Sequence, residues 1–363
     1  MKLPLGSNHY DMKVKDIILH LISTCCIAAG VSACVTNEKI VPEEEDKSIW
    51  YNPAPVKTRP QTKAIEEFPT TSTFGSYAYW VPEGKTFDAN KGDADVVTFI
   101  NNEKVSYQSN LWKGVNTYYW PHYGSLTFMS YSPYELSSRS TEFDFECNKS
   151  TGISLTGFSL PNTIGYSDSK DDILITDIVK DLKGSSAYYT SGVPTVFKHR
   201  LCKVAVKASI NNELDNAGDY IKITGITLKN IYTKGNYALV GGWSSQSELE
   251  TYSNTPLDVS LALEPASVFE ETLMIPQTTT VSDRGVGNEP ILIVSYTTYI
   301  AGVQAKKEAV LKLYSGPGSL AAWEEGKLIT YYISISTKDE YIEFSGSYNA
   351  WGDGGNDDIN MGL

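Results

Sequence analysis

Short runs in which apolar and polar residues alternate recur along most of this chain, and they constrain its fold more than any other feature. Ile329, Tyr331, Ile333 and Ile335 follow a strict period of two, which is the spacing of side chains on one face of a β-strand. Residues 74–80 alternate in the same way. Because turn residues separate such runs at short intervals, the pattern predicts an all-β fold of the sandwich or barrel type.

Further strands are expected at 96–100, 118–120, 126–131, 143–145, 153–160, 291–299, 309–314 and 341–344. Residues 171–182 fit either a helical face or a buried strand, and we interpret them as a strand followed by a turn. Gly225 falls where the alternation changes phase, which predicts a β-bulge. The 24 tyrosines, against 11 phenylalanines, suit strands with one wet face.

An export signal precedes the alternating region. Lys13 and Lys15 are followed by a mostly apolar stretch over 17–31, which is too short to span a bilayer. The sequence Val-Ser-Ala-Cys that ends at Cys34 resembles a bacterial lipobox. We therefore expect cleavage between Ala33 and Cys34 and a lipid anchor on the Cys34 thiol, with Met12 as an alternative start; an ordinary signal peptide is the other interpretation.

The chain of 363 residues is long enough for two domains. We expect a signal peptide over 1–33, a lipidated tether and pro-segment over 34–67, and β domains over 68–190 and 191–363, the second with a short flexible tail. The acidic run 43–46 and the prolines near it indicate a solvated tether. The Ser/Gly-rich segment 184–192 marks the internal boundary.

Several function classes are disfavoured by composition. The net charge of −13 and the isoelectric point near 4.9 argue against a nucleic-acid partner. His122 and His199 are the only histidines after the signal, and the chain contains no Gly-x-Ser-x-Gly motif. We expect no enzyme activity, no metal and no cofactor, and we expect Cys147 and Cys202 to be free thiols.

Two polar or aromatic patterns have competing interpretations. The tail over 353–358 faintly resembles a calcium loop, but it lacks the closing glutamate and is better explained as a flexible end. Trp112 and the run 118–121 could form a sugar-stacking platform. Aromatic residues in alternating strands more often pack in a core or across strands, and we favour that interpretation.

Several longer runs resemble the fimbrillin family of Bacteroides-type bacteria. They occur in the family's order, and they are Trp112 with 118–121 and 126–133, then 197–204, 273–277, 323–333 and 342–351. The resemblance implies two transthyretin-like β-sandwich domains in tandem, in a structural and adhesive pilus subunit. It also implies export as a lipoprotein to the outer membrane and the cell surface, where the subunit joins a fimbria.

The same resemblance implies how such a subunit assembles. In fimbrillins a trypsin-like protease removes an N-terminal strand, and a strand from another pilus subunit fills the exposed groove by β-strand addition. On this chain the candidate processing residues are Arg59, which precedes a proline, and Lys63. Ile359, Met361 and Leu363 alternate as a donor strand should. Stalk, tip and anchor roles are all compatible, and no motif identifies a host or bacterial adhesion target.

Two other functions compete with this one. A surface lipoprotein could bind glycan through exposed tryptophans and tyrosines. A β-sandwich hydrolase would need two carboxylates about 5 to 9.5 Å apart in a cleft.

Overall fold

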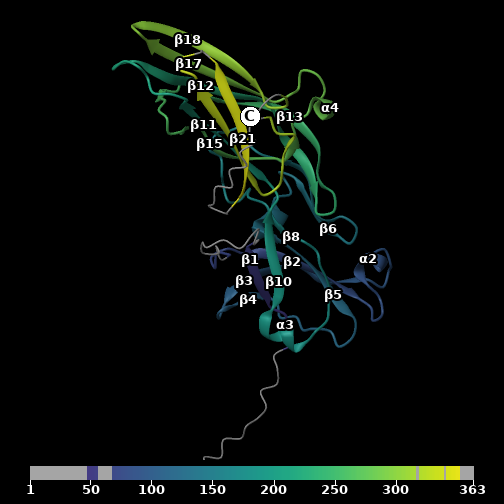
Figure 1. Ribbon diagram of the computed structural model, residues 1–363. Coiled ribbons are helices and arrows are strands. Elements are labelled where there is room, and N and C mark those ends of the chain that lie inside the picture. The colour runs from purple at the N-terminus through teal and green to yellow at the C-terminus, as the bar shows by residue number, and fades with distance from the viewer. Residues whose placement is uncertain (1–46, 56–67, 316–318, 339–340, 352–363) are drawn as a thin grey trace, which may run out of the picture. The chain divides into compact units, whose positions relative to one another are not determined.

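An eight-stranded sheet in the N-terminal part of the protein closes on itself. In the computed structural model, which describes residues 47–55, 68–315, 319–338 and 341–351, the strand order is β2-β3-β4-β1-β10-β8-β5-β9, and β5 also pairs with β2 (Figure 1). The strands are β1 (Tyr51–Pro55), β2 (Phe74–Val81), β3 (Val97–Gln108), β4 (Leu111–Gly114), β5 (Ser125–Ser132), β8 (Leu174–Thr176), β9 (Val179–Leu182) and β10 (Val193–His199). We call this sheet the strand ring.

Both faces of β2 and β5 are buried, because the ring has one core inside it and another against its outer surface. Phe74 and Ala78 of β2 belong to the inner core, whereas Tyr77 and Tyr79 of the same strand belong to the outer one. This is the division that the alternation over 74–80 predicts. The outer core also contains residues of β6 (Asp144–Asn148) and β7 (Gly152–Ser159).

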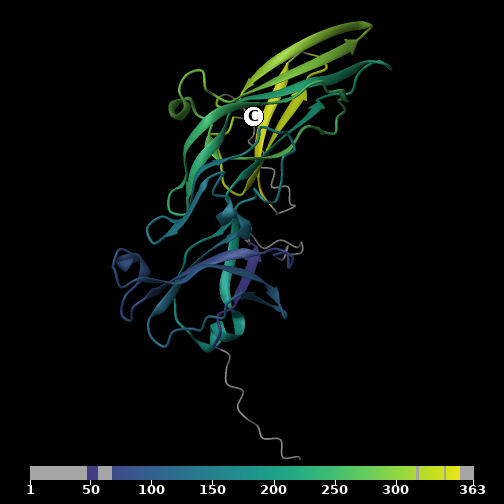
Figure 2. The ribbon, with the colours of Figure 1, turned by 180° about the vertical axis from the view of Figure 1, so that it is seen from behind.

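Two further sheets enclose the third core. A seven-stranded sheet has the order β18-β17-β12-β7-β6 with β13 and β14 paired to β12, and a four-stranded sheet has the order β15-β11-β20-β21 (Figure 2). The remaining strands are β11 (Cys202–Ile210), β12 (Tyr220–Ala238), β13 (Gly242–Asn254), β14 (Val259–Ser260), β15 (Ala266–Met274), β17 (Ile291–Ile300), β18 (Val303–Lys312), β20 (Lys327–Ile335) and β21 (Ile342–Ala350), with β16 (Gln277–Thr278) paired to β19 (Ala322–Trp323). The alternating residues 329–335 of β20 are buried in this core, as predicted.

The helices among the described residues are short. They are α2 (Phe87–Asn90), α3 (Ser186–Ser191), α4 (Val281–Arg284) and the 3-10 helix η2 (Tyr134–Ser138). None of them is long and apolar enough to cross a membrane.

Strand pairing crosses the expected domain boundary at residue 190. β10 lies beyond that boundary but pairs with β1 and β8 of the ring, and β7 lies before it but pairs with β12. The chain passes from the ring to the four-stranded sheet at Arg200 and Leu201, between β10 and β11. The division into two sandwich domains therefore stays a prediction.

Several local predictions can be compared with the structure. Residues 171–182 contain the strand β8, as predicted, but they also contain a second strand, β9, where only a turn was expected. The register of β12 against β17 shifts at Gly225, which confirms the predicted bulge. Cys147 and Cys202 are free, as expected. The solvated tether is wrong for residues 47–55, because Ser48, Ile49 and Tyr51 are buried there. The apolar side chains of Ile49 and Tyr51 gain more from the ring core than the nearby acidic residues and prolines gain from water.

Alkaline pH is expected to destabilise this fold. Burial raises the pKa of the Tyr51, Tyr131 and Tyr331 phenols, and burial raises the pKa of the Cys147 thiol to about 12. These groups stay protonated in the native state while the unfolded chain loses their protons, so stability should fall as pH rises past the ordinary values of 9.0 and 10.0. A pH series of urea denaturation curves, with tyrosinate absorbance recorded in parallel, checks this. One tyrosinate transition near pH 10 with the fold intact would contradict it.

Candidate functional site

The strand β1 lies within the ring, between β4 and β10. It pairs in parallel with β10 over Tyr51–Pro55, and Tyr51 also pairs with Trp112 of β4. Figure 1 and Figure 2 both show β1, in purple, beside β10. The residues before β1 continue the contact, since the Ile49 amide donates to the Tyr118 carbonyl at 2.7 Å and the Trp120 amide donates to the Lys47 carbonyl at 3.1 Å. We call the space that residues 47–55 fill the β1 groove.

The two long sides of the β1 groove are unequal. Five residues of β1 have register partners on β10, whereas one has a partner on β4, with an isolated bridge from Ser48 to Tyr119 beyond it. The outer face of this region is open to water, because Asn52, Pro194 and Val196 are exposed. The strand β1 is thus held mainly by its five-residue ladder with β10, and its outer face is accessible from solvent.

The inner face of β1 contributes to the ring core. Ile49 is 6% exposed and Tyr51 is 2% exposed. The Tyr51 ring meets Phe74 edge-on at 5.5 Å and Phe128 edge-on at 6.2 Å, measured between ring centroids. Aromatic pairs in this geometry add stability beyond the area they bury.

Trp50, the residue directly before β1, lies on the outer face of the segment 47–55. Its indole N–H donates to the Tyr189 carbonyl at 2.9 Å. Gly192, at a φ of +71°, lies against the indole ring, and a Cβ at this position would approach that ring to 2.7 Å. Glycine thus meets two requirements here, a left-handed backbone and room for the indole.

A buried carboxylate shapes the turn that precedes Tyr118. Glu103 is 5% exposed and accepts hydrogen bonds from the Asn116 amide at 2.7 Å and the Asn116 side chain at 2.9 Å. The Tyr118 hydroxyl donates to the same carboxylate at 3.3 Å. Burial, followed by the charge of Glu103, raises the pKa of Tyr118. These bonds position the carbonyl of Tyr118 that accepts from Ile49.

The two described residues that flank the segment 56–67, Pro55 and Phe68, both lie beside Phe197. Pro55 is the register partner of Phe197 in β10, and the Phe68 ring stacks on Phe197 with a centroid distance of 4.8 Å. Lys57, Arg59 and the candidate Lys63 fall inside this segment, which lies outside the described residues. If a bond there were cut, β1 would be held only by non-covalent contacts.

Alanine at position 192 is expected to weaken the seat of Trp50. We expect Gly192→Ala to lower the free energy of unfolding by about 1–3 kcal/mol, because the new Cβ is strained at positive φ and overlaps the indole. Gly84→Ala is the matched control, since Gly84 has a φ of +80° and nothing within 4 Å of its ideal Cβ. Urea denaturation of both variants measures the difference, and equal losses would show that the contact with Trp50 contributes nothing.

The sequence-predicted site residues all fall outside the described residues; they are Ala33, Cys34, Arg59, Lys63, Ile359, Met361 and Leu363. Sequence reasoning missed the role of residues 49–51. The signal was Ile-Trp-Tyr, three large apolar residues in succession inside a stretch otherwise rich in acidic residues and proline.

The tryptophans of the aromatic platform that glycan binding would require are buried. Trp112 and Trp120 are 8% and 6% exposed and belong to the ring core, which confirms the core interpretation, although Tyr119 is 60% exposed. His199 is hydrogen-bonded, with Nδ1 2.8 Å from Asp172 Oδ1. Its ring also stacks on Trp351 at 3.8 Å.

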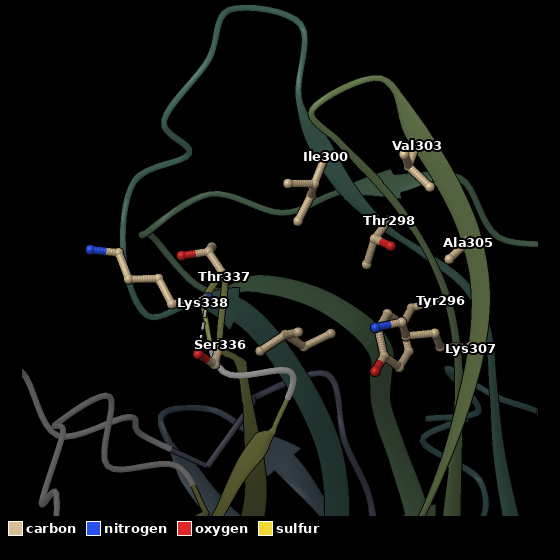
Figure 3. Close-up of a pocket in the computed structure, with 10 residues that line it drawn as sticks. Tyr296, Thr298, Ile300, Val303, Ala305, Lys307, Ser336, Thr337 and Lys338 are labelled. Atoms are coloured by element: carbon tan, nitrogen blue, oxygen red, sulfur yellow. Dashed lines mark hydrogen bonds between the residues drawn. The ribbon is translucent and has the colours of Figure 1, made fainter.

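A cavity of about 300 Å³ lies between β17, β18 and the end of β20 (Figure 3). Its lining consists of Tyr296, Thr298, Ile300, Val303, Ala305, Lys307, Ile335, Ser336, Thr337 and Lys338. These described residues include no carboxylate, so the cavity lacks the carboxylate pair that the hydrolase alternative requires. In the part of the chain that the structure describes, no group of three or more His, Cys, Asp or Glu residues could hold a metal ion.

Comparison with solved structures bears on the fold. A fimbrial protein from Bacteroides vulgatus has a similar fold, with a TM-score of 0.54, 18% identity, and coverage of 77% of this chain and 92% of that chain. A putative cell adhesion protein from Bacteroides uniformis matches with a TM-score of 0.46 and 16% identity over 84% of this chain and 100% of its own. The tip fimbrial protein Mfa3 from Porphyromonas gingivalis, with a C-terminal truncation, matches with a TM-score of 0.40 and 15% identity over 77% of this chain and 94% of its own. The first of these shows that the fold is that of a fimbrial protein.

The family follows from the sequence. The profile of the fimbrillin-like family matches residues 62–351, which is most of the chain, so the protein belongs to this family. The family comprises fimbrial and cell adhesion proteins, and the protein is not an enzyme. No curated protein matches the chain.

Proposed function

We propose that the protein is a structural and adhesive subunit of a cell-surface fimbria, built from two sandwich-like domains and exported as a lipoprotein on Cys34. In this proposal a protease cuts within 56–67, β1 leaves the ring, and a strand from another pilus subunit takes its place. The observation that carries the proposal is the position of β1. The strand β1, which comes directly before the segment that contains Lys57, Arg59 and Lys63, is an internal strand of the ring with partners on both sides.

Loss of β1 would leave a groove that needs an occupant. The backbone groups of β4 and β10 that face it would lose their partners, and the ring core would lose Ile49 and Tyr51. Buried polar groups without partners and an opened apolar core both favour the addition of a new strand. A donor strand from another subunit satisfies both requirements, which is how β-augmentation links chains.

The processing bond and the donor remain parts of the proposal. Lys63 precedes Ala64, whereas Arg59 precedes Pro60, so a protease that accepts lysine would cut after Lys63. A protease restricted to arginine would leave the chain uncut and anchored in the outer membrane by its lipid. Ile359, Met361 and Leu363 are the candidate donor strand that this chain offers to another subunit.

Limited proteolysis of the lipid-free chain that begins after Cys34 tests the proposal. Trypsin is expected to cut within 56–67, and the cut protein is expected to release β1 and to form oligomers when other pilus subunits are added, as followed by N-terminal sequencing and light scattering. A variant in which Lys57, Arg59 and Lys63 are all replaced by glutamine should stay intact and monomeric. A cut protein that keeps β1 bound and remains monomeric in the presence of other subunits would refute strand exchange.

A further inference from the structure

The inner pocket of the β1 groove has the shape of an aromatic ring. Phe74 and Phe128, which are 0% and 1% exposed, meet the Tyr51 ring at interplanar angles of 87° and 89°. A ring inserted edge-on between two fixed rings fills this space, whereas a branched or linear side chain leaves part of it empty. Cavities of this kind weaken a packed core in proportion to their volume.

The hydroxyl of Tyr51 adds little to this fit. The oxygen is buried and makes no hydrogen bond of good geometry with the described residues, although the Ser76 side chain lies near it. Because a buried polar group without a partner is destabilising, the pocket should accept phenylalanine at least as well as tyrosine. The ring, and not the phenol oxygen, is what the pocket recognises.

A second aromatic seat lies on the opposite face, one residue earlier. Trp50 rests against Gly192 and donates its N–H to the Tyr189 carbonyl. Ile49, two residues before Tyr51, points into the same core as Tyr51. Successive residues of a strand alternate between faces, so one extended segment can fill all three positions at once.

We propose that the β1 groove selects a donor strand that has an aromatic residue at the position of Tyr51 and an aliphatic residue two positions earlier. This inference rests on the proposed strand exchange and specifies the partner. Residues 352–363, which include Ile359, Met361 and Leu363, contain no aromatic residue. This tail therefore does not meet the requirement, and the groove accepts a strand from a subunit that carries the aromatic residue in preference to the tail of a second copy.

Competition among peptides tests this selectivity. A site-specific protease sequence replaces residues 58–63 of the full mature chain, the chain is cut, and peptides compete for the groove while native mass spectrometry identifies the bound one. The probes are residues 47–56, the same peptide with Tyr51→Phe or Tyr51→Leu, and residues 352–363. The control peptide carries Asn52→Ala, since Asn52 is exposed.

The Phe peptide should bind at least as tightly as the parent and the Asn52→Ala peptide equally, whereas the Leu and tail peptides should bind at least about tenfold more weakly. Equal binding of the Leu peptide or of the tail peptide would overturn the selectivity while leaving strand exchange intact.

If even the parent peptide fails to exchange, strand release is wrong, and the pocket is then tested in the uncut chain. There, equal urea midpoints for Tyr51→Phe and Tyr51→Leu would overturn it, and a lower midpoint for Tyr51→Leu would support it.

Discussion

Replacement of Tyr51 by alanine is expected to lower the free energy of unfolding of the uncut protein by about 3–5 kcal/mol, the range for removing a large buried aromatic side chain. The side chain is 2% exposed and packs between Phe74 and Phe128 in the ring core. Urea denaturation measures the loss. Hydrogen exchange at Val193, whose amide donates to the Trp50 carbonyl at 2.8 Å, reports whether β1 has left the ring.

Asn52→Ala is the matched control for this prediction. Asn52 is the next residue of the same strand but is exposed, so its replacement should change stability by less than about 0.5 kcal/mol. A loss of less than about 1 kcal/mol for Tyr51→Ala, with Val193 still protected, would show that β1 contributes little to the native ring. That result would also remove the energetic reason for a new strand to enter.

Replacement of Arg200 by methionine is expected to cost about 3 kcal/mol at neutral pH. Arg200 is 9% exposed and donates to Glu325 at 3.2 Å and to the Ile175 carbonyl at 2.9 Å. Burial raises the pKa of Glu325 above its ordinary value, and the charge of Arg200 opposes that rise. Without the arginine, a partly buried carboxylate would lose a cation that offsets its desolvation.

The stability lost in Arg200→Met is expected to depend on pH. In Arg200→Met the native pKa of Glu325 should rise further above its unfolded value. The native state then binds a proton that the unfolded chain has lost, so stability is retained below the ordinary pKa of 4.5 and falls as pH rises through the native value. Denaturation curves at pH 4 and pH 7 should therefore differ more for the variant than for the parent. The double variant Arg200→Met/Glu325→Gln should lose this extra pH dependence, and its persistence there would assign the effect to another group.

Much of the fold was predictable because its causes are local. Burial of alternate residues gave the strands around Phe74 and Ile329. The glycine at a change of phase gave the bulge at Gly225. Each of these depends on side chains within a few positions of one another, so a short window contains the whole cause.

The site was not predictable in the same way. Residues 51–55 pair with β10, whose first residue lies far along the chain, and the parallel register of Tyr51 with Val193 follows from no local pattern. Nearby acidic residues and prolines outweighed Ile49, Trp50 and Tyr51 in a composition-based interpretation. The candidate processing residues could be placed just after this strand from a family resemblance, but the internal position of the strand required the structure.

The retention of β1 bears on how a fibre of such subunits would end. If one subunit's groove receives another subunit's terminal strand, the two surfaces in contact differ, and repeated contacts of this kind form an open head-to-tail series with a polarity. In such a fibre, a chain that keeps β1 beside β10 would have its own acceptor position filled. It could give a strand but could not take one, so its incorporation would stop elongation at that end.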